Sequence, residues 1–320
     1  EQAGEAYATL ADTLIQVLSD RVGEELIAQY GRLPNGMAAI VSMGKLGGEE
    51  MTAASDLDLI TVYDYASENA KSDGDSSLPG AQYYTRFTQR LIAALSAQTA
   101  EGALYEVDMR LRPSGSQGPV ATKLSGFVDY QERSAWVWEH LALTRARVVS
   151  GPDAMREAID STIRTVLTRP RDRAAAAGEV HEMRRRIAAE KGSADIWNLK
   201  QVRGGIVDLE FTTQFLQLVN AAERPDVLDP NTEAGLTKLA KAGVLDQADA
   251  ELLIPAARLY QSLTQILRLC LEEGFDANDA PQALRELLAR STDMSDFSTL
   301  EATLKETLSR VHNAFNRLVA

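Results

Sequence analysis

The 320-residue chain contains little cysteine and little histidine. Its one cysteine is Cys270, and it has three histidines. A single cysteine excludes an internal disulfide, and the apolar run at residues 266–271 predicts a core position for it in a protein of the reducing cytoplasm. Three histidines without paired spacing do not favour a zinc site, and no histidine motif accompanies the thiol as a cysteine nucleophile would require.

Long apolar runs and basic residues are also scarce. No segment approaches the roughly 20 apolar residues that cross a membrane, and no signal-peptide pattern opens the chain. The 33 basic and 46 acidic residues give a net charge of -13, which opposes nucleic-acid binding because phosphate contacts need a basic surface. We therefore expect neither a membrane nor a nucleic acid as partner. One local group of residues is basic in spite of the negative net charge. We interpret it as a solvated helix face, in preference to a contact for an acidic partner; its members are Arg169, Arg171, Arg173, Arg184, Arg185 and Arg186.

Several common catalytic motifs are missing, including a nucleophile elbow, a Walker lysine loop and a Rossmann fingerprint. What is present is a glycine-rich turn, Gly44-Lys-Leu-Gly-Gly48, followed by Ser55-Asp-Leu-Asp-Leu59. Alternate residues of a strand share a face, so Asp56 and Asp58 hold two carboxylates side by side and favour a cation between them. Backbone amides of the turn are suited to phosphate. Together they indicate a Mg²⁺ and nucleotide site, although a solvated strand start remains the alternative.

A third carboxylate comes from a segment predicted as a strand over residues 103–111. Tyr105, Val107, Met109 and Leu111 alternate with polar residues, which is typical of a half-buried strand. Asp108 can complete a carboxylate triad if this strand lies beside Asp56, and Arg110 and Arg112 can offer positive charge to a triphosphate. An exposed, charge-alternating edge strand is the competing interpretation.

The combination resembles the nucleotidyltransferase fold of the polymerase beta type. Longer strings are similar to the glutamine synthetase adenylyltransferase family, in order from about residue 37 to about residue 218: Gly44-Lys-Leu-Gly-Gly48, Ser55-Asp-Leu-Asp-Leu59, Val107-Asp-Met-Arg-Leu-Arg-Pro-Ser-Gly115, Trp138-Glu-His-Leu-Ala-Leu-Thr-Arg-Ala-Arg147 and Gly204-Gly-Ile-Val-Asp-Leu-Glu-Phe211. The chain begins at Glu1, and we expect it to be a fragment of a longer protein.

The resemblance implies a particular chemistry. Family members carry two similar halves, one that attaches AMP to a tyrosine of glutamine synthetase and one that removes it by phosphorolysis. Arg112-Pro-Ser-Gly115 and Trp136-Val-Trp-Glu-His-Leu-Ala-Leu-Thr-Arg145 look more like the adenylylating half. The resemblance thus implies ATP as substrate, glutamine synthetase as protein substrate and a regulatory link to the PII signalling protein. A non-catalytic docking module is the alternative from another class.

The expected site follows from the motifs and the resemblance together. Catalytic and metal-binding roles fall to Asp56, Asp58 and Asp108, with Mg²⁺ as the metal. The nucleotide would contact Gly44, Lys45, Leu46, Gly47, Gly48, Ser55, Arg110 and Arg112.

The chain is expected to be α+β, with two domains. A nucleotidyltransferase domain with a small mixed sheet and an N-terminal helix is predicted over residues 1–160, and an all-α helical bundle over residues 161–320. Apolar spacing predicts helices over residues 6–30 and 83–97 and strands near 37–43 and 56–63.

A second polar motif surrounds Gly204-Gly205. Asp208 is interpreted as an acidic residue in the first turn of a helix, where it favours the helix dipole, whereas the resemblance implies that this segment lies near the active site. The roles of Lys200, Arg203 and Glu210 stay open.

Overall fold

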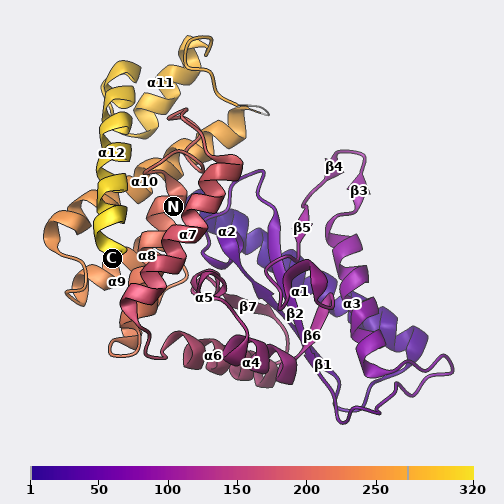
Figure 1. Ribbon diagram of the computed structural model, residues 1–320. Helices are drawn as coiled ribbons and strands as arrows, with labels where there is room; N and C mark the ends of the chain where they lie inside the picture. Colours follow the sequence, from indigo (N-terminus) through magenta and orange to yellow (C-terminus); the bar gives the residue numbers. More distant parts are fainter. Residues whose placement is uncertain (1, 272–273) are drawn as a thin grey trace. The chain divides into compact units, whose positions relative to one another are not determined.

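The structure is a computed structural model that describes residues 2–271 and 274–320. It divides into two compact units. The sheet unit comprises Glu5–Met51 and Ser55–Leu167, and the helical unit comprises Thr168–Ala320 together with Glu1–Gly4 and Thr52–Ala54. Figure 1 shows the order of the elements along the chain. The described residues are mixed α+β, with twelve α-helices and a small mixed sheet.

The sheet of the sheet unit has the order β5-β2-β1-β7, and β6 also pairs with β2. β2 is antiparallel to β1 but parallel to β5 and β6, and β7 is antiparallel to β1. β1 and β2 match the predicted strands closely, because both are short apolar runs that end in turns. The strand bounds are β1 Met37–Ser42, β2 Leu57–Asp64, β5 Val107–Asp108, β6 Ala121–Lys123 and β7 Arg147–Ser150, with a separate hairpin of β3 Gln98–Thr99 and β4 Gly102–Ala103.

Helices pack on the sheet through apolar side chains. Ile15 of α1 (Gln2–Tyr30) and Phe87 of α3 (Gly80–Leu95) share one core with Leu57 and Leu59 of β2. α6 (Asp153–Leu167) contacts β1 and β7, and α4 (Leu124–Arg133) contacts β2 and β6. The remaining elements of this unit are short: α2 Gly44–Gly47, η1 Gly115–Gln117 and α5 Val137–Leu143.

Three expectations about this unit need correction. The strand predicted over residues 103–111 is reduced to β5, although Tyr105 and Met109 are buried as the alternation required. β6 and β7 were not among the predicted strands, because strands of three and four residues give too little periodicity to be recognised. The apolar spacing of α1 predicts a buried face with Leu10, Leu14, Leu18, Val22 and Leu26. Val22 and Leu26 are buried as predicted, but Leu10 is exposed, and Ala11 and Ile15 lie in the core at that end of the face.

The described residues of the helical unit form helices joined by turns and loops, with one isolated bridge between Ser193 and Val202. α8 is the most buried of them, with Leu209, Phe215 and Leu218 inside the core. Capping aspartates and asparagine begin several of the helices, which fits their preference for helix starts: Asp172, Asn231, Asp246 and Asp296. The elements are α7 Arg173–Lys191, α8 Ile206–Asn220, η2 Pro225–Val227, α9 Thr232–Lys241, α10 Gln247–Cys270, α11 Gln282–Ser291 and α12 Phe297–Leu318.

Cys270 was predicted to lie in the core, and it does not. It is exposed at the end of α10, beside the exposed Leu269. The buried positions of α10 end with Leu263, so the apolar run at its C-terminal end extends past the core that the rest of the helix contacts. No helix in the described part of the chain is long and apolar enough to cross a membrane.

Candidate active site

Three carboxylates meet at the edge of the sheet where β2 begins. β2 and β5 run parallel, and their register pairs Asp58 directly with Asp108. Asp56 precedes the first residue of β2 and lies two positions before Asp58, so the two side chains share one face of the extended chain. One carboxylate oxygen from each of the three aspartates lies within 4.8 Å of the others. The structure therefore brings together the acidic residues that the sequence pattern singled out.

The glycine turn lies against this cluster. It forms the single-turn helix α2, which follows β1 directly. The amide of Met43 donates to the carbonyl of Asp58 at 2.9 Å, which joins the turn to β2. Gly44 has a φ of 54°, and a Cβ on it would lie 2.1 Å from Oδ2 of Asp58. Glycine is required at this position because both the left-handed backbone and the close carboxylate exclude a side chain.

Arg110 engages the third carboxylate. Its amide donates to Oδ1 of Asp108 at 2.7 Å, and its Nε donates to Oδ2 at 2.7 Å. Burial raises the pKa of Asp108, but the hydrogen bonds and charge of Arg110 outweigh that effect and leave the pKa below its ordinary value. Asp108 is therefore ionised at neutral pH, and the exposed guanidinium balances its charge.

Arg112 has a different arrangement. Its guanidinium donates to the carbonyls of Met109, Gly118 and Pro119. Arg112 therefore joins the two ends of the loop at residues 109–119 that follows β5. Its charge also helps to lower the pKa of Asp108.

The other residues expected at the nucleotide differ in exposure. Leu46 is fully buried in the core, so only its backbone can take part in binding. Gly47 and Gly48 are buried, Lys45 is half-buried, and the side chain of Ser55 is largely covered.

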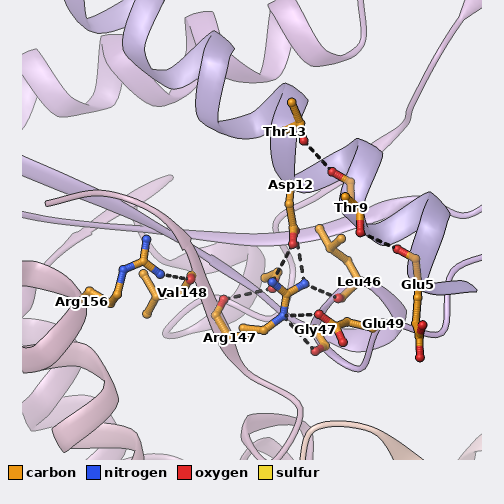
Figure 2. Close-up of polar contacts among 11 residues, drawn as sticks. Glu5, Thr9, Asp12, Thr13, Leu46, Gly47, Glu49, Arg147, Val148 and Arg156 are labelled. Carbon is orange, nitrogen blue, oxygen red and sulfur yellow. Dashed lines mark hydrogen bonds and ion pairs between the residues drawn. The ribbon is translucent and has the colours of Figure 1, made fainter. Parts of the chain in front are cut away.

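Two arginines near the glycine turn received no role from the sequence pattern. Arg145 is 4% exposed and donates to the carbonyl of Gly44 at 2.9 Å. Arg147 lies between α1 and the turn, with hydrogen bonds to Asp12, Leu46 and Gly47 (Figure 2). Residues two positions apart share one face of an extended chain, and this spacing of the two arginines was the only local signal.

A second polar cluster lies inside the helical unit. Asp208, at 1% exposure, pairs with Arg184 and accepts from the amide of Gly204 at 2.6 Å. Nδ1 of His312 lies 3.1 Å from the same carboxylate. The interpretation of Arg184 as part of a solvated face is wrong, because its partner draws it into the core, whereas Arg185 and Arg186 are exposed as expected. Asp208 thus forms a buried ion pair. Its place in the first turn of α8 also puts its negative charge at the positive end of the helix dipole.

The carboxylate cluster has the chemistry of a divalent-cation site. Three hard oxygen donors close together fit Mg²⁺, which prefers carboxylate and water oxygen to nitrogen or sulfur. A small mixed sheet that carries such a cluster beside a glycine turn is compatible with a nucleotidyltransferase-type domain.

Comparison with known proteins is more specific. The family model described as "Glutamate-ammonia ligase adenylyltransferase" matches residues 1–162, and the chain belongs to this family. A second model, described as "GlnD PII-uridylyltransferase", matches residues 176–319.

Curated relatives match along the whole chain. The chain is 54% identical over 319 residues to the "Bifunctional glutamine synthetase adenylyltransferase/adenylyl-removing enzyme" of Rhodopseudomonas palustris (strain TIE-1), covering 100% of this chain and 32% of that protein. A protein of the same name from Bradyrhizobium sp. (strain BTAi1 / ATCC BAA-1182) is 51% identical with the same coverage. The chain from Xanthobacter autotrophicus (strain ATCC BAA-1158 / Py2) is 48% identical, over 99% of this chain and 32% of its own length. The chain thus spans about a third of the length of these relatives.

Proposed function

We propose that this chain transfers AMP from ATP to a tyrosine of glutamine synthetase. The observation that carries the proposal is the convergence of Asp56, Asp58 and Asp108 beside the glycine turn. The names of the relatives support glutamine synthetase as the protein substrate. We further propose that the sheet unit is a catalytic domain of the polymerase beta type, with the boundary near residue 160, and that the bundle docks the protein partners.

The three aspartates are the residues that would hold Mg²⁺. A bound Mg²⁺ supplies positive charge that polarises phosphate oxygens and makes an oxygen nucleophile more acidic. Asp56 and Asp58 orient toward the same space because they share one face of the extended chain. Asp108 closes the cluster from the neighbouring strand, as the register of β2 with β5 requires.

The attacking hydroxyl also needs a proton acceptor, which the same cluster can supply. A tyrosine hydroxyl has an ordinary pKa near 10, so it needs an acceptor to react at neutral pH. Asp108 is ionised there, because Arg110 lowers its pKa despite partial burial. We propose that Asp108 accepts the proton of the tyrosine hydroxyl as the oxygen attacks the α-phosphate and pyrophosphate leaves.

The basic groups would contact the triphosphate. Arg110 is mostly exposed and already lies beside the carboxylates, so its guanidinium can turn from Asp108 to a phosphate oxygen without a change in the backbone. Lys45 and the amides at the start of α2 follow Gly44 directly in the chain and would hold the phosphates with Ser55. Arg112 would act indirectly: its guanidinium donates to carbonyls of the loop that follows β5 and so fixes that loop.

The direction of the reaction is proposed from the motif Arg112-Pro-Ser-Gly115 and the Trp136–Arg145 segment, which are more similar to the adenylylating half. Phosphorolysis of adenylyl-tyrosine to ADP would use the same carboxylates. The match of residues 176–319 to a PII-uridylyltransferase model supports the proposal that the helical unit takes part in regulation through the PII protein.

The deciding experiment incubates the chain with ATP, Mg²⁺ and unmodified glutamine synthetase, and measures AMP on the synthetase by intact mass. We expect AMP incorporation that depends on Mg²⁺. The parallel reaction uses adenylylated synthetase with phosphate in place of ATP. Release of AMP groups as ADP, without any incorporation in the first reaction, would overturn the proposed direction.

A further inference from the structure

The guanidinium of Arg147 joins three parts of the sheet unit. Nη1 and Nη2 donate to the carboxylate of Asp12 on α1 at 2.6 and 3.2 Å. Nη2 also donates to the carbonyl of Leu46 at 3.1 Å, and Nε donates to that of Gly47 at 3.4 Å. Figure 2 shows this side chain directed away from β7, between α1 and the glycine turn. One residue thereby connects the N-terminal helix and the last strand to α2.

The position of Arg147 is set by the sheet. β7 pairs with β1 antiparallel, and an irregularity next to Ile40 and Val41 shifts the register so that Arg147 lies opposite Ser42, the last residue of β1. The hydroxyl of Ser42 donates to the carbonyl of Arg147 at 2.9 Å. Because α2 begins two residues after Ser42, this register brings the arginine side chain to the turn. Bulges of this kind often redirect a side chain near an active site.

Arg145 contacts the turn at its other end. Its Nε donates to the carbonyl of Gly44, and its Nη2 lies 2.5 Å from Oε2 of Glu50. A Cβ on Gly47 would lie 1.8 Å from the carbonyl oxygen of Arg145, so the two backbones touch. The two arginines together bind the carbonyls of three of the four residues of α2: Gly44, Leu46 and Gly47.

The turn needs such support. A single helical turn forms one costly nucleus with few hydrogen bonds of its own. The amides of Gly48 and Glu49 donate to the carbonyls of Gly44 and Leu46, and the two arginines add a second hydrogen bond to each of these carbonyls and one to that of Gly47. Cations near those carbonyls are favourable because that end of a helix carries partial negative charge. Glu49, just after the turn, has a φ of 57°, which is strained for a residue with a side chain. Its carboxylate lies 3.7 Å from Nε of Arg147, so the same arginine also faces the strained residue.

The place of the turn determines the place of a carboxylate. Met43, at the start of α2, is bonded to the backbone of Asp58, and Gly44 touches the Asp58 carboxylate. A movement of α2 would therefore open or close the space around Oδ2 of Asp58. We propose that Arg147, held by Asp12, is a positioning residue that fixes the glycine turn against Asp58 and so sets the affinity for Mg²⁺-ATP. This inference rests on the proposed function, because it assumes that the turn and the aspartates hold the nucleotide and metal.

Arginine is suited to this task in a way that lysine is not. Its planar fork presents five N–H donors, enough for both oxygens of Asp12 and two carbonyls at once. A lysine has a single nitrogen on a flexible stem and keeps the charge without the fork. Arg147→Lys therefore separates a need for charge from a need for geometry.

Arg156 provides a matched control. It lies on α6 and donates to the carbonyl of Val148 in β7, as Figure 2 shows. No contact of Arg156 with the glycine turn is found among the described residues. Arg156→Ala removes an arginine that supports the same strand but does not hold α2.

The experiment measures the Mg²⁺ dependence of ATP binding by calorimetry and the KM for ATP in AMP transfer to glutamine synthetase. The proteins are the full 320-residue chain and its variants Arg147→Ala, Arg147→Lys, Asp12→Asn and Arg156→Ala. We expect Arg147→Ala and Arg147→Lys to weaken Mg²⁺-dependent ATP binding about 10–100-fold, as is usual when residues that orient metal ligands are removed. Asp12→Asn should have a smaller effect in the same direction. Combining Asp12→Asn with Arg147→Ala should add nothing, because Asp12 acts through the arginine.

Other outcomes would overturn the inference. Arg147 variants that bind Mg²⁺-ATP as the wild type does, or only as weakly as Arg156→Ala, would contradict it. A lower thermal stability with unchanged affinity in the folded protein would show a role in folding alone, and would also contradict it. Should Arg147→Ala not fold, Arg147→Lys and Asp12→Asn decide the question. A wild-type chain without Mg²⁺-dependent ATP binding would instead overturn the proposed function, and this inference with it.

Discussion

Gly44 and Asp58 approach each other so closely that a Cβ on Gly44 would lie 2.1 Å from Oδ2 of the aspartate. The glycine turn and the carboxylate cluster therefore form one unit, in which neither can be altered without the other. Arg147, far along the chain, donates to a carbonyl of the same turn, and Asp12 of α1 binds the guanidinium of that arginine.

The first prediction concerns Gly44→Ala. The methyl group would meet the Asp58 carboxylate, and the left-handed backbone would cost about 1–2 kcal/mol for a residue with a side chain. We expect AMP transfer to fall on the order of 10–100-fold, because the displaced carboxylate can no longer share a cation with its neighbours. Initial rates at saturating ATP and Mg²⁺, together with urea unfolding, measure both effects.

Gly23→Ala is the control for this substitution. Gly23 lies within α1, and no atom lies within 4 Å of the place its Cβ would take. Alanine there should raise the free energy of unfolding by about 0.5–1 kcal/mol and leave transfer unchanged. Equal losses of activity in the two variants would contradict the special role of Gly44.

The second prediction concerns the buried pair of the helical unit. Asp208→Asn would leave Arg184 inside the core without a counter-charge, and removing one partner of a buried pair costs about 3–5 kcal/mol. The free energy of unfolding in urea, followed by circular dichroism, measures the loss.

Glu182 offers a matched surface pair on the same helix as Arg184. It bridges the exposed Arg185 and Arg186, and exposed ion pairs contribute about 0.2–1 kcal/mol. Glu182→Gln should therefore have little effect. Similar losses for the two variants would show that the burial of Asp208 and Arg184 has no energetic consequence.

The third prediction is a pH dependence at the start of α12. The amide of Thr299, the hydroxyl of Ser295 and that of Thr299 donate to Asp296, and these bonds hold the pKa of its carboxyl below the ordinary value. The folded state thus favours the ionised form. Its contribution to stability is fully present above the ordinary aspartate pKa of about 4 and is lost as the pH falls through the folded pKa.

Asp296→Asn separates this effect from other acid-sensitive groups, because asparagine also caps a helix but does not titrate. The difference in urea midpoint between wild type and variant should be constant near neutrality and shrink in acid. A difference that does not change with pH would contradict the assignment of the lowered pKa to the cap.

Local patterns were sufficient for part of the fold. α1 and α3 follow from apolar residues at helical spacing, and β1 and β2 follow from short continuous apolar runs. Alternation on two segments showed that Asp108 could join Asp56 and Asp58 if the two strands were neighbours, and the parallel register places Asp58 beside Asp108. β7 was not predicted, because four residues between helices give too little periodicity.

Contacts between distant residues could not be read from such patterns. Arg147 and Asp12 are 135 positions apart, and nothing local to either indicates the other. Arg184 looked like a surface arginine because its neighbours are charged, and only the fold brings Asp208, 24 positions later, against it. A buried charge is recognised through its partner, which the sequence does not identify.

The central claim is that Asp56, Asp58 and Asp108 bind a divalent cation together with ATP. Calorimetric titration of ATP, with and without Mg²⁺, into the wild type and into Asp56→Asn with Asp58→Asn tests it most directly. We predict binding that requires Mg²⁺ in the wild type and is lost in the double variant, whose thermal stability is equal or higher because carboxylate repulsion is relieved. ATP binding that is independent of Mg²⁺, or that the double variant retains, would contradict the account.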